Sequence, residues 1–264
     1  MDKLLYISIL PVIVLLLYIY KKDVEKEPRG MLILIFIIGC LSTIPIAVAE
    51  VILGLFFPTE ALPTLLGTLV AVFMTIAIVE EFGKWVITYI ICYRNKEFNH
   101  VYDGIVYAVY ASLGFACIEN LLYVFTTDLF TGFLRAILSV PSHAVDAVFM
   151  GYLLSISKKA LVKNNNGKSF IFLLLSILVP SIVHAIYDAL LFRFQTSESW
   201  ILLLLFFGFV IVSYIVAIVI VNIASKDKNN IDGSYVINPV KQFCPQCGKP
   251  LVNRRCNSCG FKDN

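Results

Sequence analysis

The sequence predicts an all-α membrane protein, a polytopic bundle of about seven transmembrane helices. Of the 264 residues, 59% are hydrophobic and only 15% are charged, whereas about a quarter of an ordinary soluble domain is charged. The mean hydropathy is +0.86. The apolar residues are gathered in runs of about 20, the length of a helix that crosses a bilayer. These observations exclude an ordinary soluble fold.

Seven apolar runs follow one another along the chain. We expect transmembrane helices at about residues 4–20, 31–57, 65–92, 102–125, 131–157, 169–192 and 200–224. The first run has the length of a signal peptide, but no small-x-small cleavage site follows it, so we interpret it as a retained span. Pro58 and Pro63 bracket a turn, and the Asn- and Lys-rich segment 158–168 predicts a loop. Residues 1–224 then form one transmembrane domain.

The basic residues of the short loops predict the orientation in the membrane. Loops 21–30, 93–100 and 158–168 carry most of them, whereas the opposite ends of the spans carry only Lys3 and Arg193. Because Lys and Arg of short loops stay in the cytoplasm, we expect a cell-membrane protein with its N-terminus outside and its C-terminus inside. Seven spans satisfy this alternation, and six would break it.

The chain changes character after Ala224. Residues 225–242 are polar and predict a flexible linker. Residues 243–264 contain two Cys-x-x-Cys pairs, each followed by glycine. The four cysteines are Cys244, Cys247, Cys256 and Cys259. Four thiolates at this spacing fit a structural Zn²⁺ site in a minimal zinc ribbon.

Other roles for this C-terminal segment are less well supported. Disulfides are the alternative for the four cysteines, but reducing cytoplasm disfavours them. A site closed by four cysteines has no open coordination position and is not catalytic. Arg254 and Arg255 are a weak signal for nucleic acid and indicate a solvated surface instead.

Charged residues stand inside the third predicted span. The stretch VEEFGKW places Glu80, Glu81 and Lys84 within an apolar run, where ionised side chains are costly. Glu80 and Lys84 are four residues apart and can pair on one helix face, whereas Glu81 points about 100° away. We expect Lys84 to neutralise one carboxylate and to leave the other with its own function. The alternative is a structural ion pair.

The next three spans also carry ionisable or polar groups far from their ends. These are Glu119 and Asn120 in the fourth span, His143 and Asp146 in the fifth, and His184 and Asp188 in the sixth. In both histidine pairs the carboxylate falls on the helix face of the imidazole, where it can fix the ring tautomer. Because charges facing lipid are costly, we expect the four spans to converge on an interior cavity. A single buried histidine would more simply be a hydrogen-bonded core residue.

Four further charged residues lie nearer the ends of the spans. Glu50 is expected at the membrane interface or in the wall of a vestibule. Asp103, Arg135 and Arg193 can extend their charged groups toward the membrane surface.

This set of side chains is suited to hydrolysis. A shielded carboxylate can act as a general base, and a histidine can protonate a leaving amine. The same groups could instead ligate Zn²⁺. The chain has no His-Glu-x-x-His or Gly-x-Ser-x-Gly motif, and no Ser or Cys is evidently paired with a histidine. Activated water is therefore favoured over a covalent nucleophile.

These residues resemble the motifs of the PrsW family of intramembrane proteases. VEEFGKW looks like its Glu-Glu-x-x-Lys motif, FACIEN like its Phe-x-x-x-Glu-Asn motif, and HAIYD like its His-x-x-x-Asp motif, while His143 matches its histidine of span five. The related CAAX prenyl endopeptidases and Abi proteins have Glu-Glu-x-x-x-Arg and Phe-x-x-x-His, so Lys84 and Glu119 favour the PrsW family. The seventh span and the zinc ribbon lie outside the resemblance.

The resemblance implies a membrane-embedded endopeptidase. Its substrate would be a membrane-bound single-span protein such as an anti-sigma factor, cleaved at the start of a regulated proteolytic cascade. Glu80 or Glu81 would be the water-activating base. The remaining site residues would be Glu119, His143, His184 and Asp188, supported by Lys84, Asn120 and Asp146. The family has been described both as glutamic and as metal-dependent, and the absence of a compact metal motif favours the glutamic type.

Two other classes of protein could carry the same residues. A proton-coupled carrier also buries Glu, His and Asp in the membrane, but carriers often contain repeated halves, and this sequence shows no repeat. A signalling protein on a degenerate protease scaffold is disfavoured by the intact set of motif residues. An enzyme requires the four sites to share one cavity.

Overall fold

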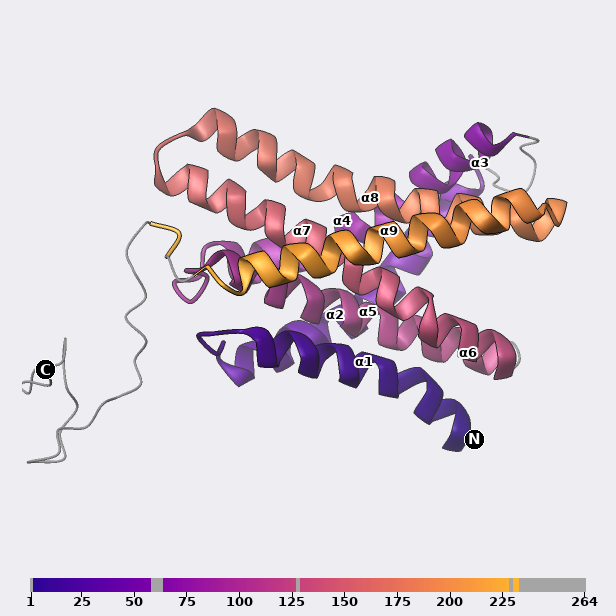
Figure 1. Ribbon diagram of the computed structural model, residues 1–264, viewed down its shortest axis with the longest axis horizontal. Coiled ribbons are helices and arrows are strands. Elements are labelled where there is room, and N and C mark those ends of the chain that lie inside the picture. Colours follow the sequence, from indigo (N-terminus) through magenta and orange to yellow (C-terminus); the bar gives the residue numbers. More distant parts are fainter. Residues whose placement is uncertain (1, 58–63, 127–128, 228–229, 233–264) are drawn as a thin grey trace, which may run out of the picture.

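The computed structural model describes residues 2–57, 64–126, 129–227 and 230–232 (Figure 1). In this part of the chain all regular structure is helical. The helices are α1 (Asp2–Lys22), α2 (Arg29–Gly54), α3 (Leu65–Val72), α4 (Ile78–Thr88), α5 (Val101–Thr126), α6 (Leu129–Ile137), α7 (Ser139–Val162), α8 (Asn166–Ser197) and α9 (Trp200–Ala224). Two π-helical turns, η2 (Phe73–Ala77) and η3 (Tyr89–Tyr93), flank α4. The prediction of an all-α fold is confirmed.

The helices correspond to the predicted spans. Six described stretches are long and apolar enough to cross a membrane: Arg29–Gly54, Leu65–Tyr93, Val101–Thr126, Phe130–Val162, Asn166–Ser197 and Trp200–Ala224. The remaining predicted span is α1, which has 21 residues. The chain is a multi-pass membrane protein.

One predicted span, residues 131–157, is broken. α6 ends at Ile137 and α7 begins at Ser139, so the two helices separate at Leu138. Pro141 accounts for the break, because a proline ring collides with the carbonyl group four residues earlier, here that of Ile137. In the first turn of α7 the same proline is tolerated, since its missing N–H has no helical partner there.

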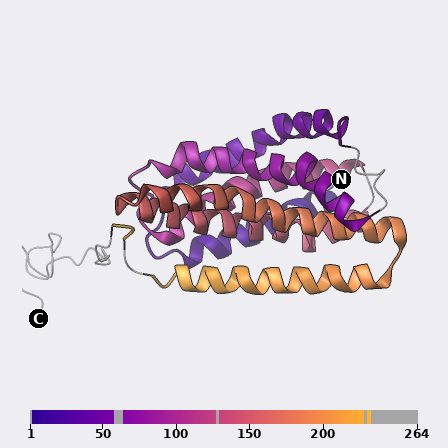
Figure 2. The same cartoon turned by 90° about the horizontal axis from the view of Figure 1, so that it is seen from above.

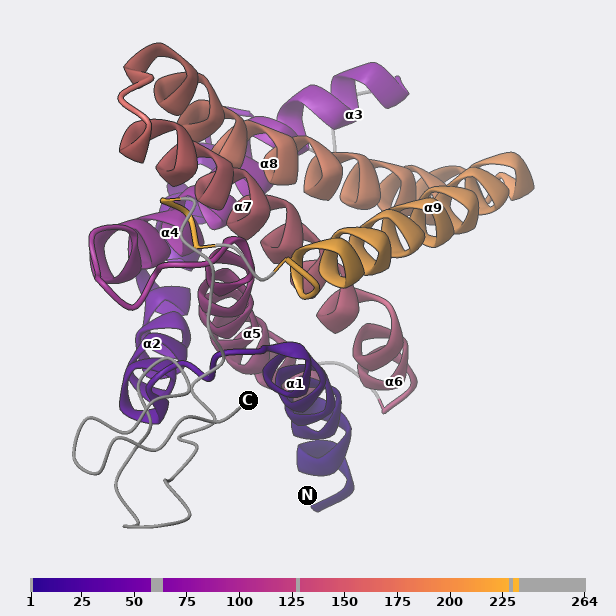
Figure 3. The ribbon, with the colours of Figure 1, turned by 60° about the vertical axis from the view of Figure 1, so that its left-hand side comes forward.

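α5 lies at the centre of the bundle and is buried along most of its length. It packs between α1 and α2 on one side and α7 on the other (Figure 3). Gly104 of α5 and Gly151 of α7 allow these two helices to approach closely, because a Cβ on either would strike the backbone of the other. Small residues at such contacts are typical of membrane helices. α9 lies along the outside of the bundle against α7 and α8 (Figure 2).

The turn between α7 and α8 is shorter than the loop predicted at 158–168. Asn164 has a φ of 56°, a left-handed conformation that asparagine tolerates better than most residues. The side chain of Asn165 caps α8 by accepting the N–H of Lys168 at 3.0 Å. Both helices therefore extend into the predicted loop.

A short segment after α9 returns to the bundle. Ile231 is buried against the helical core, and its N–H donates to the carbonyl of Asn99 at 2.6 Å. The start of the predicted linker thus packs on the turn before α5. The four cysteines of the predicted zinc ribbon lie outside the described residues.

Candidate active site

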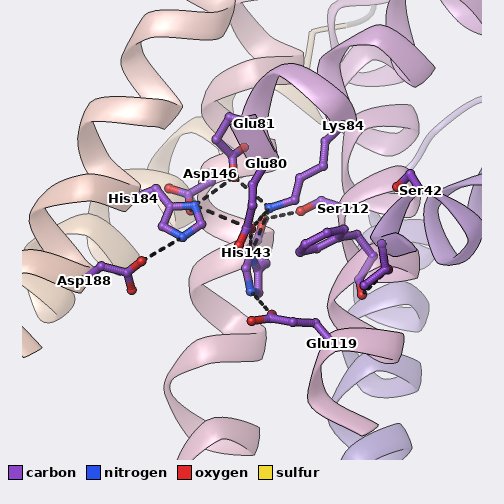
Figure 4. A network of polar contacts seen from close by, with 12 residues as sticks. Ser42, Glu80, Glu81, Lys84, Ser112, Glu119, His143, Asp146, His184 and Asp188 are labelled. Atoms are coloured by element: carbon purple, nitrogen blue, oxygen red, sulfur yellow. Dashed lines mark hydrogen bonds and ion pairs between the residues drawn. The ribbon is translucent and has the colours of Figure 1, made fainter. Parts of the chain in front are cut away.

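Charged and polar side chains from four helices meet inside the bundle (Figure 4). We call this group the intramembrane cluster. It consists of Glu80, Glu81 and Lys84 from α4, Glu119 from α5, His143 and Asp146 from α7, and His184 and Asp188 from α8. The four spans thus converge at one place, which the enzyme hypothesis requires.

The π-helical turn η2, which precedes α4, affects the direction in which α4 presents its charges. A π turn contains about one residue more than an α turn and so rotates the helix that follows it. Between η2 and η3, α4 buries Glu80, Glu81 and Lys84. Phe82 lies on its outer side and is half exposed. The charged face therefore points into the bundle.

Lys84 joins the charges of the cluster. Its Nζ lies 2.8 Å from Glu80 Oε2 and 2.8 Å from Glu81 Oε1, and 3.2 Å from His143 Nδ1. The ring of Phe115 lies 4.4 Å from the ammonium group. The expectation that Lys84 neutralises only one glutamate is wrong, because residues three and four positions earlier on a helix both lie within its reach.

The contacts of His143 fix its tautomer. An ammonium group only donates, so Nδ1 of His143 accepts from Lys84 and the ring proton resides on Nε2. Nε2 lies 2.9 Å from Glu119 Oε2, to which it donates. Asp146, the expected partner of His143, instead lies 3.7 Å from Nδ1 of His184. Neighbours on α4 and α5 already occupy both ring nitrogens of His143.

His184 stands between carboxylates at both of its ring nitrogens. Nδ1 lies 3.0 Å from Glu81 Oε1, and Nε2 lies 3.4 Å from Asp188 Oδ2. The expected pairing with Asp188 is present. A doubly protonated ring would find an acceptor for each N–H, so His184 is well placed to hold and release a proton.

Arg135 on α6 belongs to this site, although the sequence suggested a position near the membrane surface. Its Nη2 lies 2.8 Å from Glu119 Oε1, and its guanidinium group stacks 3.7 Å over the ring of Tyr123. Its Nε has no hydrogen-bond partner among the described residues. The break at Leu138 lets α6 diverge from α7 and bring Arg135 to α5. Pro141 is the sequence signal that could have revealed this break.

Asn120 does not join the cluster. Its amide donates to the carbonyl of Ser8 in α1 at 3.5 Å. Successive residues of a helix point about 100° apart, so the same turn of α5 directs Glu119 toward the cluster and Asn120 toward α1.

A cavity of about 470 Å³ lies beside the cluster. Its polar wall residues include Glu50, Glu80, Glu119, Arg135, His143, Asp146, His184 and Asp188. Glu81 and Lys84 do not line it. The residues that line it include members of the C-terminal halves of α2, α5 and α8 and of the first turns of α7. The cavity therefore lies toward the end of the bundle away from segments 21–30, 93–100 and 158–168, which carry most of the basic residues.

Four members of the cluster could hold a metal ion by their positions alone. Glu80, Glu81, His143 and His184 each offer a ligand atom, and these atoms lie within 4.8 Å of one another. However, the ammonium group of Lys84 already contacts three of these residues. A Zn²⁺ about 2 Å from the contacted atoms would lie within roughly 3 Å of that ammonium, where two cations repel strongly. A metal ion held by these four residues would therefore have to displace the ammonium group of Lys84 from its observed position.

Most of this chain is similar in sequence to known proteins. The family model described as PrsW family intramembrane metalloprotease matches residues 27–223. The chain is 38% identical over 196 residues to Protease PrsW of Oceanobacillus iheyensis, covering 74% of this chain and 86% of the relative. It is 34% identical over 227 residues to Protease PrsW of Halalkalibacterium halodurans, and the match covers 86% of this chain and 99% of the relative. Identity to Protease PrsW of Bacillus subtilis is 35% over 199 residues, covering 74% and 84%. No solved structure matches the chain at a significant level.

Proposed function

Because the chain belongs to the PrsW family of intramembrane proteases and is therefore an intramembrane endopeptidase, we propose that Glu80 activates the water that hydrolyses its substrate. The position of Glu80 carries this proposal. Its side chain lines the cavity, and its Oε2 lies 3.9 Å from His143 Nδ1 and 4.0 Å from His184 Nδ1. A base and a proton donor must both be close to one reacting carbonyl.

Glu80 and Glu81 take different roles because their surroundings differ. Glu80 faces the cavity. Glu81 has no exposed side-chain surface and does not line the cavity. Glu81 instead holds Nδ1 of His184. We assign Glu80 as the general base and Glu81 as a positioning residue.

The proposed reaction is a direct attack by water. Glu80 takes a proton from water as the water oxygen bonds to the peptide carbonyl carbon. The C–N bond then breaks, and doubly protonated His184, held at Nε2 by Asp188, gives its Nδ1 proton to the leaving nitrogen. The proton on Glu80 passes to His184, whose Nδ1 is 4.0 Å away, and this restores the starting state.

Arg135 and Glu119 complete the proposed site. Arg135 lines the cavity, and its Nε lacks an acceptor among the described residues. This N–H can donate to the oxyanion that forms on the substrate, where a fixed donor lowers the barrier. Glu119 holds Arg135 on one side and His143 on the other, and so fixes the positions of both.

The cavity position also supports a proposal for orientation and substrate. If the basic loops are cytoplasmic, the N-terminus lies outside and the cavity lies in the outer half of the bilayer. The substrate would be a membrane-bound single-span protein, such as an anti-sigma factor, cleaved near the outer end of its span. The cytoplasmic tail would hold structural Zn²⁺ through Cys244, Cys247, Cys256 and Cys259, apart from the reaction.

The test compares glutamate variants on one single-span substrate in detergent, with and without a chelator. We expect cleavage by the full-length protein to survive chelation. Glu80→Gln should lose at least about a hundredfold in rate, the size of a general-base contribution, and Glu81→Gln should lose less. Glu97→Gln changes a partly exposed loop carboxylate and serves as the control.

A metal-dependent mechanism is the second candidate, since the matching family model is described as a metalloprotease. Loss of cleavage on chelation, followed by recovery with Zn²⁺ in a chain truncated before Cys244, would establish that mechanism. Full activity of Glu80→Gln would remove Glu80 from the role of base.

A further inference from the structure

Glu50 is a carboxylate in the cavity wall for which the reaction gives no role. It lies on α2, close to the helix end at Gly54. It shares one helix face with Thr43 and Ala47, and all three side chains line the cavity. Oε1 of Glu50 is buried and has no hydrogen-bond partner in the described part of the chain.

The other carboxylates around the cavity all have partners within the chain. Glu80 pairs with Lys84, and Glu119 pairs with Arg135. Asp146 and Asp188 both lie beside His184. No ion pair or hydrogen bond links the Glu50 side chain to any described residue, and both nearby permanent cations are already engaged.

An unpaired carboxylate at this depth is costly. Charged groups in membrane proteins are generally paired or face a water-filled cavity, and they mark the path of a substrate. A cation that entered the cavity would find one carboxylate free to pair with it. The acidic groups of the cavity and cluster also outnumber Lys84 and Arg135, so the site as a whole favours an entering cation.

We propose that Glu50 forms a subsite for a lysine or arginine side chain of the substrate, near the bond that is cleaved. This inference rests on the proposed function. The apolar walls at Ile76, Leu122 and Leu134 would contact the aliphatic part of that side chain, while its charged end reaches Glu50.

A peptide side chain fits this subsite better than a metal ion. A divalent cation requires several ligands at short range. Glu50 is not among the residues whose ligand atoms converge. A single carboxylate beside apolar surface is suited to one extended cationic side chain, which brings its own apolar stem.

The test uses single-span peptides in which lysine, norleucine or glutamate is placed in turn at each position around the cleaved bond. At one position, we expect the full-length protein to prefer lysine over norleucine by about tenfold or more in kcat/KM, the scale of a buried charge pair. Glu50→Gln should abolish this preference. Glu50→Lys should favour glutamate at the same position, and Glu97→Gln should keep the wild-type preference.

A binding measurement separates failure of this inference from failure of the proposed function. The dissociation constants of the same peptides are measured with Glu80→Gln protein and with the Glu50→Gln, Glu80→Gln double variant. A lysine preference that requires Glu50 supports the subsite even if cleavage is absent. The inference is overturned if no position favours a cation, or if the preference survives in Glu50→Gln protein that unfolds at the wild-type temperature.

Discussion

At the scale of single residues, the ammonium group of Lys84 decides how the charges of the site are arranged. It contacts both glutamates of α4 and a histidine of α7, and its side chain has no exposed surface. It also occupies the space in which these ligands would hold a metal ion. One residue therefore joins the charges of the cluster and stands in the place that a metal ion on the same ligands would take.

Replacing Lys84 should both destabilise and inactivate the protein. Lys84→Met leaves two buried carboxylates without their cation, and breaking a buried pair in this way costs about 3 kcal/mol or more. We expect a lower midpoint of thermal unfolding in detergent and no cleavage. Lys96→Met is the matched control, since that side chain is 89% exposed. An unchanged midpoint in Lys84→Met would contradict the central role of this ammonium group.

A buried carboxylate outside the intramembrane cluster should make the stability of the protein depend on pH. Glu27 lies between α1 and α2 and accepts a hydrogen bond from Tyr107. Burial, reinforced by the charge of Asp103, raises the pKa of Glu27 from 4.5 to about 9. Between these values the folded protein keeps a proton that the unfolded chain releases, so stability falls as pH rises.

The measurement is the midpoint of thermal unfolding in detergent between about pH 6 and about pH 8. This single proton contributes up to about 1.4 kcal/mol per pH unit, so the midpoint should fall with rising pH. Asp103 is a further buried carboxylate that interacts with Glu27, and its protonation also contributes to the pH dependence, so Glu27→Gln should remove only part of the slope. An equal slope in both proteins would show that Glu27 does not hold the proton.

At the scale of elements, the positions of the helices depend on a few close contacts. α5 and α7 touch at Gly104 and Gly151, and these two helices carry Glu119 and His143 of the site. Their separation fixes the hydrogen bond of 2.9 Å between the two side chains. Packing at the two glycines therefore affects the distance between Glu119 and His143, several helical turns away.

Gly151→Ala should separate α5 from α7. The added Cβ would collide with the backbone of Gly104, and overpacking of this kind costs about 1–3 kcal/mol. We expect a lower unfolding midpoint and reduced cleavage. Gly208→Ala in α9 is the control, because a Cβ there meets nothing within 4 Å. Equal midpoints for the two variants would show that the contact adapts without cost.

At the scale of the whole molecule, orientation remains a prediction from charge. Reporter fusions after Asn165 and after Glu198 test it. We expect a green fluorescent protein to fluoresce when fused after Asn165, and alkaline phosphatase to be active when fused after Glu198. The reverse pattern would place the cavity in the inner half of the bilayer and would require a substrate cleaved on the cytoplasmic side.

The sequence predicts the architecture far better than it predicts the partners of each side chain. Spans are readable because a helix in lipid requires a continuous apolar run. Glu119 and His184 stand out because charge is rare in such runs. Their partners depend on the rotation and depth of separate helices. His143 therefore pairs with Glu119 instead of Asp146, a choice that spacing along one helix cannot reveal.

Arg135 shows the same limit for a whole element. Its role depends on the divergence of α6 from α7 at Leu138, which hydropathy does not detect because both helices are apolar. The π-helical turns on either side of α4 are similarly invisible in the pattern of residue types. Of the two features, only the break has a residue that signals it, Pro141, and hydropathy alone does not single out that proline.

The contacts of Lys84 also bear on how the protein is made. Because both of its glutamate partners belong to its own helix, this span can carry its compensating charge while it leaves the translocon, before α7 and α8 are synthesised. Each uncompensated charge at mid-membrane costs about 3 kcal/mol on insertion. In a glycosylation-mapping assay, Lys84→Ala should lower the integrated fraction of the segment Leu65–Tyr93 when it is tested alone. Equal integration would mean that the nascent span relies on later helices. Reduced integration would mean that both membrane insertion and catalysis depend on Lys84. Its loss would then lower the amount of protein in the membrane as well as its activity.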